Sequence, residues 1–300
     1  MSLADIQKNI GFVSSPRFVV NDLQLRIIAV ENRQSKKNSP YSVLKLADSS
    51  GETKGILWWD KQIWTTLNYQ AGDIVTLTGE FLEKKDRHIL NIGSIQVVDP
   101  ARITPECLLP TTWLPDHAKD YAQQFCWLYR QIQNRYLREF LVEVLMNPVV
   151  SLGYCSGQGS LLFHHNWPGG LLQHSVTLAM NFCSSSENHS VEERDLGITV
   201  ALVHDIGKAV TTAGQSRTDV GQHQPHDMSA LEVLAQPLAR LDHVSPEASN
   251  HIRSFFKPKG WFPKNELKVI SSIRALDAEC IQPRLQKPFS DSMFISPFAF

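Results

Sequence analysis

Hydrophobic and polar positions follow two different periods along this chain. From residue 17 to residue 98 they alternate in short runs, the period of strands with one buried face. From Asp116 onward apolar residues recur at three- and four-residue spacing, which predicts helices. Residues 101–115 show neither period and are punctuated by prolines. We therefore predict a β domain at 1–100, a linker at 101–115, a helical domain at 116–290 and a tail at 291–300.

The alternating region divides into five runs separated by polar turns. A short helical stretch at 61–67 precedes the fourth run. Five strands with a helical segment before the fourth are typical of an OB-fold β-barrel. The predicted fold class is therefore multidomain α and β, a five-stranded OB-fold barrel followed by an all-helical domain. The five runs are 18–30, 41–48, 54–59, 75–82 and 88–92.

Basic and aromatic side chains are interleaved along the predicted strands. Aromatic rings stack on bases while cations hold phosphates, which is how single strands are bound without strict sequence readout. We expect Arg26 on this face, and the predicted nucleic-acid-binding residues are Tyr41, Lys45, Trp58, Phe81 and Arg87. The alternative is structural, because one of the neighbours Trp58 and Trp59 must face a barrel interior. The basic run at 84–87 is also typical of a solvated hairpin tip.

Composition narrows the class of protein. The chain has 300 residues, 42% hydrophobic and 20% charged, which is typical of a globular protein of one or two domains. Its formal net charge is −1, so any nucleic-acid site must be local. Five scattered cysteines without a Cys-x-x-Cys pair argue against a zinc ribbon or a disulfide framework. With no signal-like N-terminus and no apolar run of about 20 residues, we expect a soluble cytoplasmic protein without a membrane partner.

One apolar run ends in a histidine next to an aspartate. Residues 198–203 are almost entirely apolar, so His204 and Asp205 are expected at the end of a buried helix. Burying both groups is unfavourable unless something satisfies them. A divalent metal would do so, and so would an ordinary His–Asp hydrogen bond, and the doublet alone does not separate the two. Lys208 follows as a cation within reach of an anionic substrate.

Further potential ligands lie on other apolar helices. His174 falls in the first turns of a helix that follows Gly169 and Gly170, and His165 lies in the loop before it. Asp277 lies on an apolar helix near the C-terminus. The metal ligands predicted from this order are His174, His204, Asp205 and Asp277. Nitrogen and carboxylate ligands together favour Mn²⁺ or Fe²⁺, with Zn²⁺ as the alternative.

These residues resemble the HD-domain metal-dependent phosphohydrolase superfamily, in which a histidine, an HD doublet and a last aspartate bind metal among packed helices. The string from His164 to His174, with its His-His, Gly-Gly-Leu and final His, is similar to the YhaM-type 3′–5′ exoribonucleases. That family joins an OB-fold to an HD domain. The strings from Thr218 to Gly221 and from His251 to Ser254 are also similar to it, as is His226.

The resemblance implies metal-dependent hydrolysis of a phosphodiester, most specifically trimming of single-stranded RNA, or DNA, from its 3′ end. The catalytic set would be Asp205, Lys208, His165 and His226. Lys208 would neutralise charge on the phosphate, and the two histidines would position substrate or donate to the leaving oxygen. His223 has no counterpart in the resemblance, and we expect it on a loop surface.

The chain departs from the family at Phe255 and Phe256, where two adjacent histidines are usual. Phenylalanine binds no metal, so the departure predicts one metal ion in place of two. It also keeps two alternatives open. One is hydrolysis of nucleotides or cyclic nucleotides at the same metal site. The other is a nucleic-acid-binding protein with a degenerate site, in a role such as that of a mobile element.

Overall fold

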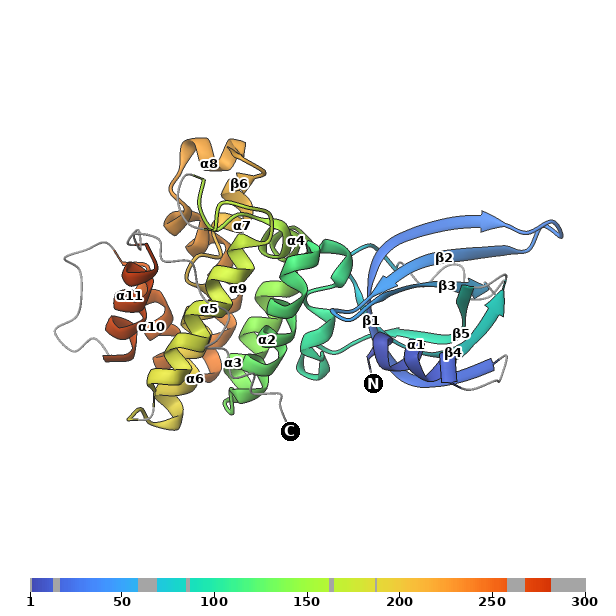
Figure 1. The fold of residues 1–300 in the computed structure, drawn as a ribbon, viewed down its shortest axis with the longest axis horizontal. Coiled ribbons are helices and arrows are strands. Elements are labelled where there is room, and N and C mark those ends of the chain that lie inside the picture. The colour runs from blue at the N-terminus through green and yellow to red at the C-terminus, as the bar shows by residue number, and fades with distance from the viewer. Residues whose placement is uncertain are drawn as a thin grey trace.

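A β-sheet part and a helical part lie next to each other along the long axis of the molecule (Figure 1). The computed structural model describes residues 2–12, 17–58, 69–84, 87–161, 165–186, 188–257 and 268–281. Its order of elements, a five-stranded sheet followed by mostly helical structure, is the order that the two hydrophobic periods predict.

The N-terminal part is a sheet with the strand order β1-β2-β3-β5-β4. β4 also pairs with β1, so each strand has two hydrogen-bonded neighbours and the sheet closes on itself, consistent with an OB-fold. β3 runs parallel to β5, and the other pairs are antiparallel. The helical stretch expected at 61–67 lies outside the described residues. The strands are β1 (Arg17–Gln34), β2 (Pro40–Ala47), β3 (Glu52–Trp58), β4 (Ile74–Lys84) and β5 (Arg87–Val97).

A helix that we did not predict, α1 (Leu3–Phe12), packs against this sheet (Figure 1). Its Leu3, Ile6 and Ile10 are buried in the same hydrophobic cluster as the inward-facing strand residues. Asp48 caps the N-terminus of α1 from the sheet part, because its Oδ2 accepts a hydrogen bond from the Leu3 backbone N–H at 2.8 Å. The spacing of the three apolar residues is helical and was the available signal in the sequence.

The helical part encloses the larger hydrophobic core. α5 and α6 lie close together because Gly197 has no side chain; a Cβ there would lie 2.2 Å from the Phe182 ring. α11 packs on both of them. The helices are α2 (Lys119–Gln131), α3 (Arg135–Met146), α4 (Pro148–Ser156), α5 (Gly170–Ser185), α6 (Val191–Val203), α7 (Lys208–Thr211), α8 (Asp219–His223), α9 (His226–Val244), α10 (Pro246–Phe255) and α11 (Lys268–Ile281).

One short hairpin interrupts the part that we expected to be all helical. β6 (Thr212–Ala213) pairs with β7 (Ser216–Arg217). Gly214 in the turn between them has a φ of +57°, in the left-handed region that glycine tolerates best. With α8, the hairpin forms a lobe that projects from the helical part (Figure 1).

The segment 101–115, which we expected to be a linker, packs against the helical core. It contains the 3₁₀ turns η1 (Pro100–Arg102), η2 (Pro105–Cys107) and η3 (Thr111–Trp113), and η4 (Asp116–Ala118) follows it. The prolines begin turns, and apolar residues between them join the helical core. Single turns impose no regular period, so the hydrophobic pattern did not reveal this packing. The buried residues are Ile103, Cys107, Leu108, Leu109 and Leu114.

Arg26, which we expected on the nucleic-acid face, is instead fully buried between the two parts. Its guanidinium donates to the carbonyls of Leu108, Leu145 and Met146 at 3.2, 2.9 and 2.7 Å. It also donates to Gly72 on the sheet side and lies 4.8 Å from the centre of the Trp113 ring. Burial lowers the pKa of Arg26 to about 10, so the group stays charged at neutral pH. Arg26 therefore ties the sheet to the end of α3.

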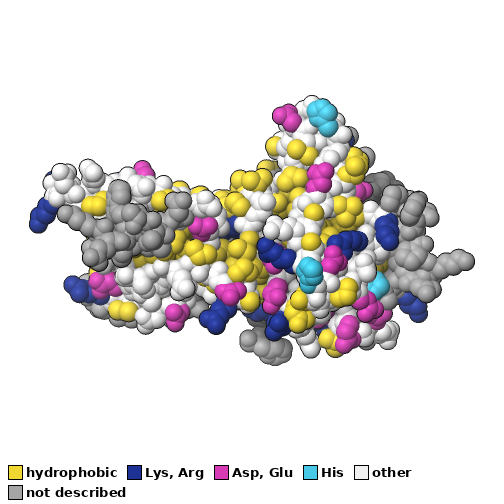
Figure 2. All heavy atoms as spheres, turned by 180° about the vertical axis from the view of Figure 1, so that it is seen from behind, with side chains coloured by type: hydrophobic (Ala, Val, Ile, Leu, Met, Phe, Trp, Pro, Cys, Tyr) yellow, Lys and Arg dark blue, Asp and Glu magenta, His cyan; other side chains and the backbone are white. Residues whose placement is uncertain are grey.

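Charges are mixed across the face shown in Figure 2, where Lys and Arg side chains lie among Asp and Glu. On this face the described Lys and Arg side chains form no broad basic patch, which agrees with the formal net charge of −1. Within the described ranges, no helix combines the length and the apolar character needed to cross a bilayer.

Candidate metal centre and its cavity

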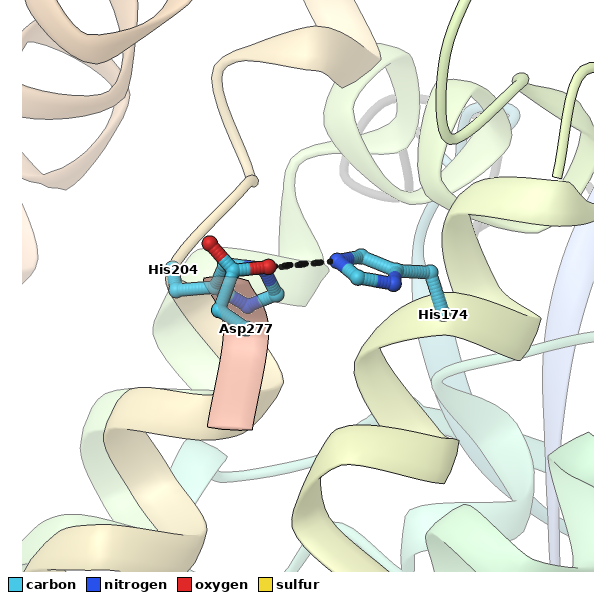
Figure 3. Close-up of side chains that lie close together, drawn as sticks. All are labelled: His174, His204 and Asp277. Carbon is cyan, nitrogen blue, oxygen red and sulfur yellow. Dashed lines mark hydrogen bonds and ion pairs between the residues drawn. The ribbon is translucent and has the colours of Figure 1, made fainter. Parts of the chain in front are cut away.

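Three helices bring the predicted ligands to one point. His174 lies in the second turn of α5, His204 caps the C-terminus of α6 with Asp205 next to it, and Asp277 lies on α11. Figure 3 shows the side chains of His174, His204 and Asp277 pointing toward one another from these separate elements. The side chains of His174 and His204 are each only 2% exposed.

The Nε2 atoms of the two histidines lie close to each other and to both carboxylates. His174 Nε2 is 3.1 Å from Asp277 Oδ1, 3.1 Å from His204 Nε2 and 3.5 Å from Asp205 Oδ2. His204 Nε2 is 3.3 Å from Asp205 Oδ2 and 3.6 Å from Asp277 Oδ1. His174, His204 and Asp277 therefore form a compact group of potential metal ligands, and Asp205 lies within 3.5 Å of both histidines.

These separations fit ligands that share one ion. At metal–ligand distances of about 2.1 Å, neighbouring ligand atoms lie roughly 3.0 Å apart at octahedral angles and roughly 3.4 Å apart at tetrahedral angles. Hydrogen bonds fit less well. His174 Nε2 faces one nitrogen and two carboxylate oxygens, and its single hydrogen can point at only one of them.

A backbone carbonyl orients the ring of His204. The Ala201 carbonyl accepts from His204 Nδ1 at 2.8 Å. In the neutral ring Nε2 then carries the lone pair that a metal needs, the usual arrangement of a histidine ligand. The direction of this hydrogen bond supports His204 as a ligand through Nε2.

The site has a strong preference for positive charge. Burial lowers the pKa of His204, but Asp205 and Asp277 outweigh it and raise that pKa to about 10. Burial likewise raises the pKa of Asp205, but His204, Lys208 and His174 hold it well below its usual range. The carboxylates therefore stay ionised and favour a cation between them, whether a proton or a metal ion.

A cavity of about 700 Å³ opens from these ligands toward the hairpin lobe. His174, Asp205 and Asp277 line its inner end, and Lys208 and His226 line the wall beside them. Lys208 Nζ donates to Asp205 Oδ2 at 2.5 Å and to the Gly159 carbonyl at 2.7 Å. His226 Nε2 lies 3.4 Å from Asp205 Oδ1. Lys208 and His226 therefore both lie next to the candidate ligands.

Two basic residues of the cavity wall differ from expectation. His223 is exposed, as expected of a surface residue, but it ends a short helix and lines the cavity, as does Arg217, which we did not single out. Arg217 lies on β7 and His223 ends α8. The elements of this lobe are too short to show a hydrophobic period, so the sequence contains no signal for either residue. The fold of the lobe then brings both side chains to the cavity wall.

His165 contacts the ligand set from its outer side. Its ring centre lies 5.4 Å from that of His174. Its φ of +57° is uncommon for a residue with a side chain. The Gly159 N–H donates to the His165 carbonyl at 2.9 Å, and Gly170 packs so closely on His165 that a Cβ would meet its carbonyl oxygen at 2.1 Å. The surrounding glycines thus hold a strained backbone at the edge of the site.

Phe255 lies beside the metal ligands. Its ring is 6.1 Å from that of His204 and nearly perpendicular to it. The Arg274 guanidinium lies 5.3 Å from the Phe255 ring centre and donates to the Phe255 carbonyl at 2.9 Å. The Phe255 ring supplies no ligand atom, and it packs edge-on beside His204.

The predicted nucleic-acid face is present only in part. Tyr41 and Trp58 are paired across β2 and β3, with ring centres 5.0 Å apart, and Trp58 is 51% exposed. Lys45 lies on the same outward side of β2. Phe81 was a wrong choice, because it is 1% exposed in the sheet core and cannot stack on a base. The side chain of Arg87 lies outside the described residues, as does Trp59.

Comparison with known proteins gives distant relatives. No protein-family model matches the chain. It is 23% identical over 185 residues to the 3′-5′ exoribonuclease YhaM of Listeria innocua, covering 61% of this chain and 58% of that protein. The protein of the same name from Bacillus pumilus is 24% identical over 204 residues, covering 66% of this chain and 62% of that protein. The chain thus spans about three fifths of the length of these relatives.

Proposed function

We propose that this chain is a metal-dependent phosphodiester hydrolase that trims single-stranded RNA from the 3′ end. The observation that carries the proposal is a cluster at the end of a cavity, in which His174 Nε2 and His204 Nε2 lie 3.1 Å apart and each lies 3.1 to 3.6 Å from a carboxylate oxygen of Asp277 and of Asp205. The substrate and the direction of trimming come from the distant relatives named exoribonucleases.

The four residues would hold Mn²⁺ or Fe²⁺, because these ions accept imidazole and carboxylate ligands together. When bound, such an ion supplies a Lewis acid that polarises a phosphoryl oxygen and lowers the pKa of a water molecule. Phe255 beside His204 supports a site for one ion.

Residues on the cavity wall would handle the charge of the substrate. Lys208 is held between Asp205 and Gly159, so its ammonium would sit at a fixed place beside the reacting phosphate and stabilise its negative charge. The side chain of His226 is 40% exposed and lies in the cavity, where it would donate a proton to the leaving oxygen. His165 would hold the ring of His174 in place.

The N-terminal sheet would act as an OB-fold that delivers single strands to the cavity. Tyr41 and Trp58 offer paired aromatic rings, and Lys45 offers a cation for phosphate. In this proposal residues 1–100 form the binding domain and 116–290 the HD domain. The packed segment 101–115 holds them together.

A second candidate function is a nucleic-acid-binding protein whose site does not hydrolyse its ligand. The apolar ring of Phe255 beside the ligands favours it, because such a ring contributes neither a ligand nor a proton. Both candidate functions use the same binding surface, but only the hydrolase would cleave the bound nucleic acid.

One experiment separates these candidates. Metal-reconstituted protein is incubated with single-stranded RNA labelled at its 5′ end, with and without chelator, and with a parallel panel of nucleotides and cyclic nucleotides. We expect a ladder of labelled products that shorten step by step, and no products with chelator. Binding without turnover under Mn²⁺ or Fe²⁺ would favour the second candidate, and hydrolysis of nucleotides alone would assign the site to that other substrate class.

A further inference from the structure

We propose that Arg217 and His223 form a subsite for a second phosphate of the substrate, next to the phosphodiester that reacts at the metal centre. The inference rests on the proposed function and extends it. It makes the cavity selective for a polynucleotide, which carries a phosphate at every linkage, over an ester with one phosphate.

Charge is distributed unevenly along the cavity wall. Asp205 and Asp277 both lie at the inner end, among the metal ligands. Every other ionisable side chain of the described lining is a lysine, an arginine or a histidine: Lys208, Arg217, His223 and His226. With a metal ion neutralising the two carboxylates, the cavity would be positive along its length. One phosphate at the inner end leaves Arg217 and His223 without an anion.

The outer residues are held at a fixed place relative to the metal ligands. Thr218 Oγ1 donates to the Val210 carbonyl at 2.7 Å, and the Thr218 N–H donates to the Thr211 carbonyl at 3.0 Å. A Cβ at Gly221 would lie 2.0 Å from the Thr211 carbonyl oxygen, so the lobe fits tightly on α7. α7 begins at Lys208, and the Lys208 N–H donates to the Asp205 carbonyl at 2.9 Å. A short chain of close contacts thus connects Arg217 to the metal site.

Local hydrogen bonds orient both side chains. Arg217 Nη1 donates to the Gly221 carbonyl at 3.3 Å, which brings the guanidinium to the wall formed by α8. His223 Nδ1 donates to the Asp219 carbonyl at 2.8 Å, so Nε2 on the far edge of the ring is the atom that would meet an anion. A guanidinium and an imidazole are side chains typical of phosphate sites.

The test compares two dinucleotides that differ by one phosphate. Hydrolysis is measured for a dinucleoside monophosphate, which has only the reacting linkage, and for the same dinucleotide with a 5′-phosphate. Each is tested with the wild type, with Arg217→Gln and with Arg240→Gln. Arg240 is the matched control, since it lies on α9, pairs with Glu143 and is outside this cavity. A nucleoside triphosphate is a further substrate.

We expect the wild type and Arg240→Gln to prefer the 5′-phosphorylated dinucleotide in kcat/KM by roughly tenfold or more, the contribution of a charge-assisted hydrogen bond. Arg217→Gln should reduce this preference to near unity. Equal rates for both dinucleotides in the wild type, or a preference that survives Arg217→Gln, would overturn the subsite and leave the proposed function standing. Hydrolysis of the triphosphate alone would overturn the polynucleotide assignment. Absence of all hydrolysis would contradict the proposed function, and the subsite with it.

Discussion

At the scale of single residues, hydrogen bonds to backbone carbonyls orient two side chains of the candidate centre. The Ala201 carbonyl fixes one nitrogen of His204 and leaves Nε2 for the shared space, and Gly159 fixes the Lys208 ammonium beside Asp205. Because these groups are buried and oriented in advance, the proposed reaction would need little reorganisation when charge develops on a phosphate.

Lys208 provides the first prediction. Replacing it with methionine removes the ammonium and keeps much of the apolar stem. We expect kcat on RNA to fall by about a hundredfold, because one preorganised charge beside the reacting phosphate is lost. Steady-state kinetics measure this, with Lys119→Met as control, since Lys119 pairs only with the exposed Asp116 in the described structure. Unchanged kcat in a protein with normal metal content would mean that Lys208 has no part in the reaction.

Trp58 provides the second prediction. Trp58→Ala removes an exposed ring that lies beside Tyr41, so affinity for an RNA oligomer should fall roughly tenfold, the contribution of one stacked base. Hydrolysis of a small phosphodiester should be unaffected. Fluorescence anisotropy measures the affinity, and Val19→Ala is the control because Val19 is also exposed on the sheet. Equal affinity in the two variants would remove Trp58 from the binding surface.

At the scale of elements, the sequence predicted the strands and the helices that carry the ligands because their periods are regular. The sequence also predicted that His174, His204, Asp205 and Asp277 come together, since each lies on or directly after an apolar helix. The hairpin lobe with Arg217 escaped prediction, because two-residue strands have no measurable period. Phe81 was placed on the wrong face because alternation identifies two faces and does not say which is inside.

Close packing of α5 on α6 provides the third prediction. A methyl group at Gly197 would overlap the Phe182 ring and push apart the helices that carry His174 and His204. We expect Gly197→Ala to lower the free energy of unfolding by about 1–3 kcal/mol and to weaken metal binding. Denaturant unfolding and metal titration test both parts. Gly93→Ala is the control, since a Cβ there meets Thr78 at an ordinary 3.6 Å. Similar stability and metal affinity in both variants would contradict this account.

At the scale of the whole molecule, the two parts are joined by packing that hydrophobic periods do not reveal. From the sequence, Arg26 was expected to be a basic residue on the exposed face of a strand. In the structure it is buried against carbonyls of the segment 101–115 and of α3. Those carbonyls come together only in the folded structure, so the buried position of Arg26 could not be predicted from the local pattern of hydrophobic residues.

Arg26 provides the fourth prediction. Arg26→Leu would leave the carbonyls of Leu108, Leu145 and Met146 buried without that donor, and we expect a loss of about 3 kcal/mol or more in the free energy of unfolding. Unfolding in guanidinium chloride, followed by fluorescence, measures this free energy. Arg17→Leu on the same strand is the control, because its side chain is 71% exposed. Equal stability of the two variants would show that Arg26 does not hold the parts together.

The most direct test of the metal-centre claim is the bound metal content of the protein. The wild type, Asp205→Ala and Asp116→Ala are loaded with Mn²⁺, freed of excess ion and analysed by inductively coupled plasma mass spectrometry. Asp205 Oδ2 lies 3.5 Å from His174 Nε2 and 3.3 Å from His204 Nε2, whereas the exposed Asp116 pairs with Lys119. We predict about one ion per chain in the wild type and in Asp116→Ala, and a sharp loss in Asp205→Ala. A folded Asp205→Ala protein that keeps the wild-type metal content would contradict the account.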